Sequence, residues 1–452
     1  MTLQADSPAT GARIPLSHTQ NFLRIFDQGD AAGPFGGRYN IVVGWRVGGP
    51  LDPAVLRDAL TDVVARHDTL RATIVREGDG HQTFADPSPA GLTVVSLDGT
   101  PGEDRARVAE EFCGDIEAGT YDSATIPHLR VFYGRFDATD GVIVLVVHHT
   151  AGDGWSMQLL MRDIAALYAL RSGFPADLPD AASYAEYVRW QIDGEDAELT
   201  EMSQEYWREK LAGARMLTVP TDHLRSAELP RSSPVHRFAL SRETTAATMA
   251  LAEATRSSAF MVALTAYKVA LAGLLDATDI AIPTLTSGRT EPRFDNTVGP
   301  FFNFVPLRTD LSGVTTFREA LARVRTTCLD AYSNELPFAR VVSEAPELMG
   351  PMAEDDKAAC AFQAWQFSEA LYGTKVGDLT YAEIRERLLP QADGTDIPDG
   401  ALLTLDMDPA GRIFGNIAYN ANLYTAETAE RLASAFAAAL TAGVADPDAP
   451  LT

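Results

Sequence analysis

The sequence predicts a mixed α/β protein built from two lobes. Helical and strand patterns alternate along its 452 residues, and 46% of these residues are hydrophobic, which is enough for two cores of ordinary domain size. Two irregular stretches interrupt the alternation: residues 173–182 are rich in Pro, Ala and Asp, and residues 219–234 contain three prolines. We place the boundary in the first stretch and expect an N-terminal lobe over residues 1–178 and a C-terminal lobe over residues 179–452.

The N-terminal lobe is expected to combine an early helix with two strand pairs. The step Asp52-Pro53 is a typical helix start, and apolar residues from Leu56 to Val64 follow on one helical face. The expected strands cover residues 70–75, 81–85, 127–136 and 141–147.

A histidine-rich string follows the most apolar run of the chain. The run ends at Val147, and residues 148–154 read HHTAGDG. Apolar residues from Met157 to Tyr168 then recur at helical spacing, so the string occupies a turn between a buried strand and a helix. A rigid scaffold holds the polar groups of such a turn at its edge, which is typical of functional sites. A chance HHxxxDG string is expected on the order of once in a thousand chains of this kind.

The C-terminal lobe continues the alternation. Helical patterns cover residues 184–191, 203–211, 244–275 and 426–442, and strand patterns cover residues 280–285, 298–307, 401–407 and 413–419. These elements predict a second α/β core.

Composition excludes several classes of function. The formal net charge is -25, so the chain lacks the basic surface with which proteins bind nucleic acid or anionic lipid. Cys113, Cys328 and Cys360 lie too far apart for a metal or disulfide framework, which fits a reducing compartment. The most apolar run is too short to span a bilayer, and the first 12 residues lack a signal pattern. We therefore expect a cytoplasmic protein with no nucleic-acid or membrane partner.

The HHxxxDG string resembles the signature of condensation domains of nonribosomal peptide assembly, and further blocks similar to that family follow in the same order. They are SHTQ at 17–20, RHDTLR at 66–71, YAEY at 184–187 with Glu in place of Asp, VGPFFN at 298–303 with PLR at 306–308, and NELPF at 334–338. A clear match to the final block near residues 360–370 is missing. No adenylation motif or carrier serine motif is visible, so we expect one such domain standing alone.

The resemblance implies a fold and an activity. The fold would be two chloramphenicol-acetyltransferase-like lobes in a V-shaped pseudo-dimer, with the active site in a tunnel between them. The enzyme would transfer an acyl group from a carrier-protein thioester to an amine or alcohol, as relatives in enediyne and siderophore assembly do. It would bind no cofactor tightly and would use the phosphopantetheine arm of a partner carrier protein. We expect it to be a monomer with a small-molecule acceptor.

The resemblance also assigns the site. His149, the second histidine, would accept or hold the proton of the nucleophile, since a neutral imidazole suits that task near neutral pH. Whether it acts as a general base or only positions the nucleophile stays open. Asp153 would orient the turn through a buried ion pair, for which Arg289 is the candidate partner. The backbone N–H of Gly154 could stabilise the oxyanion.

Other residues have competing interpretations. His148 is expected to be structural, and His67 to be a core histidine with a satisfied partner. Trp155 either lines the tunnel or anchors the next helix. Ser287 and Asn303 are candidates for the tunnel wall, although Asn303 could instead make a strand-end hydrogen bond. No third ligand stands at metal spacing, so no metal is expected.

Ser17, in the first block, is expected to act as a cap or turn residue.

Two other functions are weighed against condensation. One is a coenzyme-A-dependent acyltransferase of the HxxxD type, which the doubled histidine and the VGPFFN and LPF blocks disfavour. The other is a non-catalytic recruitment domain, which the intact motif disfavours. Cyclising relatives replace the histidines by Asp, and epimerising relatives carry a Glu-rich segment where this chain has residues 286–289, so neither activity is expected.

Overall fold

The computed structural model describes residues 8–194, 197–365, 371–408 and 411–451. The chain divides into two compact units. The first unit contains Met1–Glu195 together with two later segments, Ser287–Phe302 and Phe367–Arg385. The second unit contains Asp196–Thr286, Asn303–Gln366 and Glu386–Thr452. We call Ser287–Phe302 the returning segment, because it belongs to the first unit while the residues on both sides of it belong to the second.

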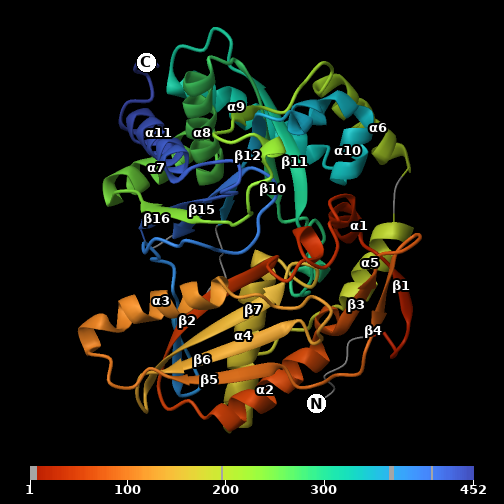
Figure 1. Cartoon of the computed structure of the whole chain (residues 1–452), viewed down its shortest axis with the longest axis vertical. Helices are drawn as coiled ribbons and strands as arrows, with labels where there is room; N and C mark the ends of the chain where they lie inside the picture. The colour runs from red at the N-terminus through yellow and green to blue at the C-terminus, as the bar shows by residue number, and fades with distance from the viewer. Residues whose placement is uncertain (1–7, 195–196, 366–370, 409–410, 452) are drawn as a thin grey trace. The chain divides into compact units, whose positions relative to one another are not determined.

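A six-stranded sheet forms the framework of the first unit, in the order β13-β14-β2-β7-β6-β5. Its strands are β2 (Asn40–Gly48), β5 (Gly91–Ser96), β6 (Leu129–Arg135), β7 (Asp140–His148), β13 (Tyr372–Val376) and β14 (Leu379–Glu383). Strands β2, β7, β6 and β5 are labelled in Figure 1. Helices α2 (Pro53–Arg66) and α4 (Gly154–Arg171) cover one face, and α3 (Arg105–Glu117) covers the other. Since β7 is covered on both faces, its uninterrupted run of Val, Ile and Leu is what a central strand requires.

A smaller layer completes the first unit. Strands β1 (Arg13–Pro15), β3 (Ala72–Val75) and β4 (His81–Phe84) form a three-stranded sheet in the order β1-β4-β3. Helices α1 (His18–Ile25) and α5 (Tyr184–Asp193) belong to the same unit. Ser17 begins α1 with a capping box shared with Gln20, so the predicted capping role of Ser17 is confirmed.

The second unit is built on a seven-stranded sheet in the order β11-β10-β12-β15-β16-β9, with β8 paired to β12. Its strands are β8 (Thr218–Pro220), β9 (Val235–Ala239), β10 (Asp279–Thr286), β11 (Asn303–Asp310), β12 (Lys357–Trp365), β15 (Ala401–Asp408) and β16 (Arg412–Tyr419). Its helices are α6 (Ala197–Lys210), α7 (Arg242–Thr255), α8 (Ala259–Leu275), α9 (Phe317–Ser333), α10 (Phe338–Glu344) and α11 (Ala426–Ala445).

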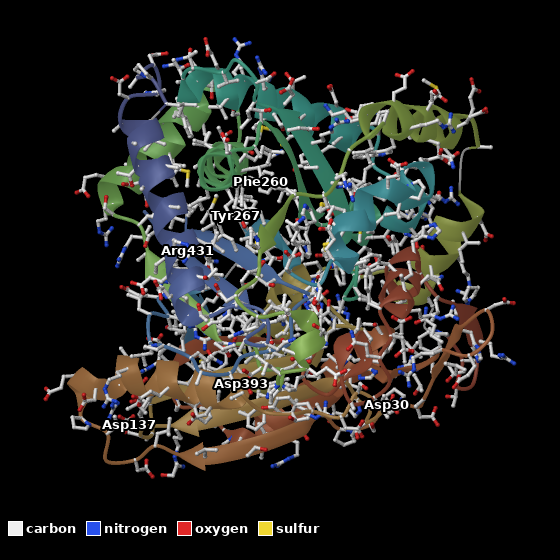
Figure 2. The ribbon with its side chains drawn as sticks, turned by 45° about the horizontal axis from the view of Figure 1, so that its top comes forward. Asp30, Asp137, Phe260, Tyr267, Asp393 and Arg431 are labelled. Carbon is white, nitrogen blue, oxygen red and sulfur yellow. The ribbon has the colours of Figure 1, made fainter. Side chains whose placement is uncertain are left out.

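One continuous core fills the second unit. Helix α8 supplies Phe260 and Tyr267 (Figure 2). The ring centre of each lies 5.5 Å from that of Phe362. Within the described residues, no single helix is long and apolar enough to cross a membrane; α7 and α8 meet that test only together, as a pair bent by 108°.

The mixed α/β prediction is confirmed, and three predicted elements need correction. Residues 244–275 are not one helical stretch, because Arg256 adopts a left-handed φ of 51° and Ser258 caps a new helix, α8. The strand expected at 298–307 begins only at Asn303, since the five residues before it belong to the returning segment. The strand expected from residue 70 begins at Ala72, after a short 3₁₀ turn.

Candidate active site

Strand β7 ends at His148, whose ring is buried and fully hydrogen-bonded. Its Nε2 lies 3.1 Å from the carbonyl oxygen of Gly36, which can only accept, so Nε2 carries the proton. Nδ1 then accepts from the hydroxyl of Thr150 at 2.8 Å and from its backbone N–H at 3.3 Å. Burial lowers the pKa of His148 to about 3, so the ring is neutral near pH 7. These hydrogen bonds are consistent with the structural role expected of His148.

The next residue, His149, is partly exposed, and two aromatic rings contact its imidazole. Its backbone N–H donates to the carbonyl oxygen of Tyr39 at 3.0 Å. The imidazole lies 4.7 Å from the ring of Tyr39, tilted by 33°, and 5.3 Å from the ring of Phe302, nearly perpendicular at 78°. Burial lowers the pKa of His149 to about 4, and the charge of Asp153 and the backbone of Gly152 counteract that fall. The imidazole is therefore an uncharged base near neutral pH.

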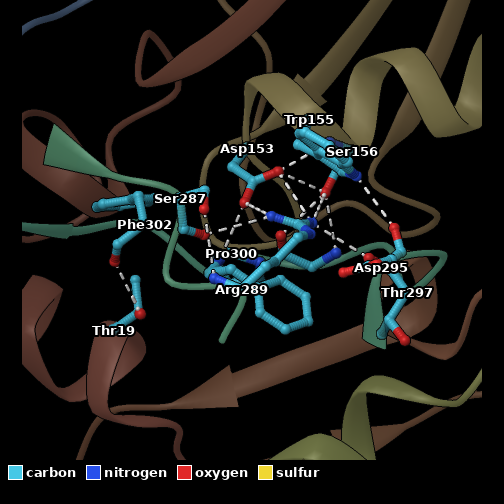
Figure 3. A network of polar contacts seen from close by, with 12 residues as sticks. Thr19, Asp153, Trp155, Ser156, Ser287, Arg289, Asp295, Thr297, Pro300 and Phe302 are labelled. Carbon is cyan, nitrogen blue, oxygen red and sulfur yellow. Dashed lines mark hydrogen bonds and ion pairs between the residues drawn. The ribbon is translucent and has the colours of Figure 1, made fainter. Parts of the chain in front are cut away.

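Asp153 caps α4 and is the centre of a buried ion pair (Figure 3). Its Oδ1 accepts from the backbone N–H of Ser156 at 2.8 Å. Its Oδ2 accepts from Nη1 of Arg289 at 2.6 Å and from the backbone N–H of Phe301 at 3.1 Å. The two charged side chains are 5% and 3% exposed, so the carboxylate is an anchor whose oxygens are already occupied. The pairing expected between Asp153 and Arg289 is present.

Arg289 and Ser156 tie the returning segment to the start of α4. Arg289 donates through Nη2 to the carbonyl oxygen of Thr297 at 3.2 Å, and its guanidinium lies 4.0 Å from the ring centre of Phe301. Ser156 Oγ accepts from the N–H of Gly299 at 3.0 Å. The motif and the returning segment thus form one polar network within the first unit.

Gly154 and Trp155 are the first residues of α4. The N–H of Gly154 is one of the four at a helix start that have no partner inside the helix. Trp155 donates from Nε1 to the carbonyl oxygen of Asp295 at 3.0 Å, which anchors the returning segment. Gly154 does not adopt a positive φ; Gly288 does, at +61°.

The two tunnel candidates lie in different units. Ser287 opens the returning segment and is exposed, with its carbonyl oxygen 3.5 Å from Nη1 of Arg289. Asn303 belongs to the second unit, where its side chain donates to Glu335 and to the carbonyl of Leu336 and accepts from the N–H of Phe338. Asn303 therefore makes the strand-end hydrogen bonds that we weighed as its alternative.

Sequence reasoning missed three residues of this site: Tyr39, Ser156 and Phe302. Ser156 had a usable signal, since it stands three residues after Asp153 at the start of a helix. Phe302 is part of the VGPFFN block, but no local sequence pattern indicates that it contacts His149. His67 was interpreted correctly, because it is buried and bonded to Asp163 at 2.9 Å. Across the described part of the chain, no three His, Cys, Asp or Glu side chains could hold a metal ion together.

Gly299 offers a test of the network. A methyl group there would lie 2.1 Å from the ring of Tyr184, whose hydroxyl donates to the carbonyl of Pro300 or to Ser17 Oγ. We expect Gly299→Ala to destabilise the fold by about 1–3 kcal/mol, as overpacking does, and to lower activity with it. Gly102→Ala is the matched control, since nothing lies within 4 Å of its Cβ position. Equal urea midpoints for the two variants would contradict this close contact.

Comparison with known proteins identifies the family. The sequence model of the condensation domain matches residues 12–371. The chain belongs to the condensation-domain family. It is 32% identical to the probable nonribosomal peptide synthetase CymA of Salinispora arenicola and 32% identical to a dimodular nonribosomal peptide synthase of Bacillus subtilis. It aligns over 100% and 96% of its own length but spans only 6% and 18% of those two proteins.

Solved structures agree with this assignment. The SgcC5 protein of Streptomyces globisporus superimposes with a TM-score of 0.93 and 43% identity, over 96% of this chain and 100% of that one. The first condensation domain of the calcium-dependent antibiotic synthetase, at 18% identity and a TM-score of 0.78 over 98% of both chains, shares the fold. The predicted fold class is therefore confirmed: condensation domains have two chloramphenicol-acetyltransferase-like lobes. Domains of this family act in natural-product biosynthesis on substrates carried by phosphopantetheine-bearing proteins, and generally form amide bonds.

Proposed function

We propose that this condensation domain transfers an acyl group from a carrier-protein thioester to a small acceptor, with His149 as the proton acceptor. The observation that carries the proposal is the His149 imidazole, which is partly exposed, neutral near pH 7 and near enough to the buried Asp153–Arg289 pair for the charge of Asp153 to act on it. The likeness to SgcC5 over the whole of that chain supports it. We further propose that the protein acts as a monomer.

The proposed reaction needs no activation by ATP, because a thioester is already an activated acyl group. The acceptor oxygen or nitrogen attacks the carbonyl carbon, and its proton passes to His149. The C–S bond then breaks, and the proton on His149 passes to the departing phosphopantetheine sulfur. One thioester and one acceptor thus give one ester or amide and one free thiol. We propose that the N–H of Gly154, at the positive end of α4, stabilises the oxyanion formed in between.

An alcohol is our preferred acceptor, which makes the product an ester. The SgcC5 structure was obtained in complex with (R)-(-)-1-(2-naphthyl)-1,2-ethanediol and sucrose, and the first of these is an aryl diol. An alcohol barely ionises near neutral pH. A base that accepts the proton of the attacking group therefore increases the reactivity of an alcohol more than that of an amine. Amide formation, the general reaction of the family, is the alternative.

A recruitment function has one observation in its favour. The X-domain from teicoplanin biosynthesis, solved in complex with OxyB, superimposes with a TM-score of 0.73 and 25% identity. Such a function would require no neutral base and no intact ion pair, and this chain has both.

The acceptor and donor can be tested together. The chain would be incubated with an acyl group on a phosphopantetheinyl carrier protein and, separately, on coenzyme A, each with 1-(2-naphthyl)-1,2-ethanediol or the matching amino alcohol. We expect product only with the carrier, and an ester with the diol. An equal rate with acyl-coenzyme A would favour the HxxxD-type acyltransferase, and no product with any pair would favour recruitment.

The pH dependence of the reaction follows from the depressed pKa of His149. The reaction requires the neutral ring, so kcat/KM should not change with His149 ionisation above about pH 5 and should fall as the pH drops through about 4. This fall on the acid side of the pH profile would be measured as kcat/KM in a series of buffers with overlapping pH ranges. Circular dichroism would confirm that the protein stays folded at each pH. An acid limb centred near the ordinary value of about 6.5 would mean that the ring is hydrated as in water.

A further inference from the structure

Two aromatic rings contact His149 from different directions, and neither belongs to the HHxxxDG string. Tyr39 and Phe302 are 7% and 3% exposed, and their ring centres lie 4.7 Å and 5.3 Å from that of the imidazole. One ring is tilted against the imidazole and the other meets it edge to face, and both geometries are favourable for aromatic pairs. A side chain held in this way loses its freedom to change rotamer.

We propose that Tyr39 and Phe302 are positioning residues that fix the His149 imidazole, and that His148 and Asp153 act on His149 through them. This inference rests on the proposed function, because it assigns a purpose to holding that ring. His148 and Asp153 would then have the same role, because each fixes the position of a ring that contacts His149.

The Tyr39 side of this arrangement is held by His148. Hydrogen bonds hold the backbone on both sides of Tyr39. The first is at Gly36, whose carbonyl oxygen accepts from Nε2 of His148 at 3.1 Å. The second is at Tyr39 itself, whose carbonyl oxygen accepts from the N–H of His149 at 3.0 Å. Asn40 adds a third bond, from Nδ2 to the carbonyl of Gly37 at 2.8 Å. The first histidine therefore secures the chain that carries the ring of Tyr39.

The Phe302 side is held by Asp153. The N–H of the preceding residue, Phe301, donates to Oδ2 of Asp153 at 3.1 Å. The carbonyl oxygen of Phe302 accepts from Thr19 Oγ1 at 3.0 Å (Figure 3). Arg289, bonded to the same carboxylate, covers the ring of Phe301. The aspartate therefore secures the end of the returning segment, from which the ring of Phe302 reaches His149.

The two buried rings also cover part of the imidazole and so reduce its contact with water. The ionisable groups near His149 are Asp153, whose charge favours protonation, His148, which is neutral, and Tyr39 itself. Removing either ring should admit water, and hydration favours the charged imidazolium. The pKa of His149 should then rise toward its ordinary value of about 6.5.

Tyr39→Leu and Phe302→Leu test the inference, with Tyr39→Phe and Phe302→Tyr as variants that keep a ring. We expect the leucine variants to lose about tenfold more kcat/KM at about pH 5.5 than at about pH 8, because a ring with a pKa near 6.5 is mostly protonated at the lower value. The ring-keeping variants should shift the pH profile less than the leucine variants do. Tyr372→Leu removes an exposed ring of the same unit and should leave the profile unchanged.

A titration of the histidine rings by NMR separates this inference from the proposed function. The His149 signal is assigned by its loss in His149→Ala, and the leucine variants should show it titrating at a higher pH than the wild type. That result in a protein without transfer activity would leave the positioning intact and overturn the function. An active enzyme whose leucine variants keep both the wild-type titration and the wild-type rate profile would overturn the positioning.

Discussion

His149→Ala is expected to lower kcat/KM for acyl transfer by roughly 10²–10⁴-fold, the usual contribution of a general acid–base group. In the proposed mechanism the His149 imidazole, which directly follows the last residue of β7, accepts the proton, and alanine leaves the attacking group without that acceptor. Initial rates with a carrier-bound thioester at saturating acceptor would measure the loss.

The control for this variant is another histidine of the same unit. His81→Ala removes a partly exposed imidazole in β4, outside the motif, and should keep the wild-type rate. Both variants should unfold near the wild-type temperature. A His149→Ala enzyme as fast as the wild type would leave the positioning of substrates as the sole source of catalysis.

Asp153→Ala is expected to cost about 3–5 kcal/mol in the free energy of unfolding, because it leaves the buried guanidinium of Arg289 without its partner. The cap of α4 at Ser156 and the bond to Phe301 are lost with it. Activity should fall as well, since these bonds hold the returning segment beside His149. Urea unfolding gives the energy, and the rate is measured where the variant is still folded.

A double-mutant cycle shows whether the pair itself is responsible. Asp153→Asn and Arg289→Gln should each destabilise the fold, and the double variant should cost less than the sum of the two. The exposed pair of Arg107 and Glu111 is the control, since Glu111→Gln should leave stability close to that of the wild type. Strict additivity in the buried pair would mean that the two side chains do not depend on each other.

The parts of the site that lie on one continuous stretch of chain could be predicted from sequence. The apolar run of β7 and the helical spacing after Met157 placed the motif between a strand and a helix, as the structure has it. The cap at Asp52 marked the start of α2 for the same reason, because capping chemistry is local. Arg289 came from the family resemblance and not from periodicity.

The parts that depend on distant segments could not be predicted. Tyr39 immediately precedes β2, a strand whose pairing with β7 places it beside His149, and no local pattern announces such a contact. The return of Ser287–Phe302 to the first unit likewise depends on hydrogen bonds to Asp153 and Ser156. Local sequence patterns do not indicate bonds between such distant segments. The boundary placed at residue 178 stays a prediction.

The most direct test of the central claim is the mass of an acyl-loaded carrier protein. The carrier would be incubated with the chain, with His149→Ala, or with neither, in the presence of an aryl 1,2-diol. The account predicts that the wild type alone returns the carrier to its free-thiol mass while an equal amount of ester appears. A carrier that stays loaded, or that loses its acyl group to water at the same rate with or without the chain, would contradict it.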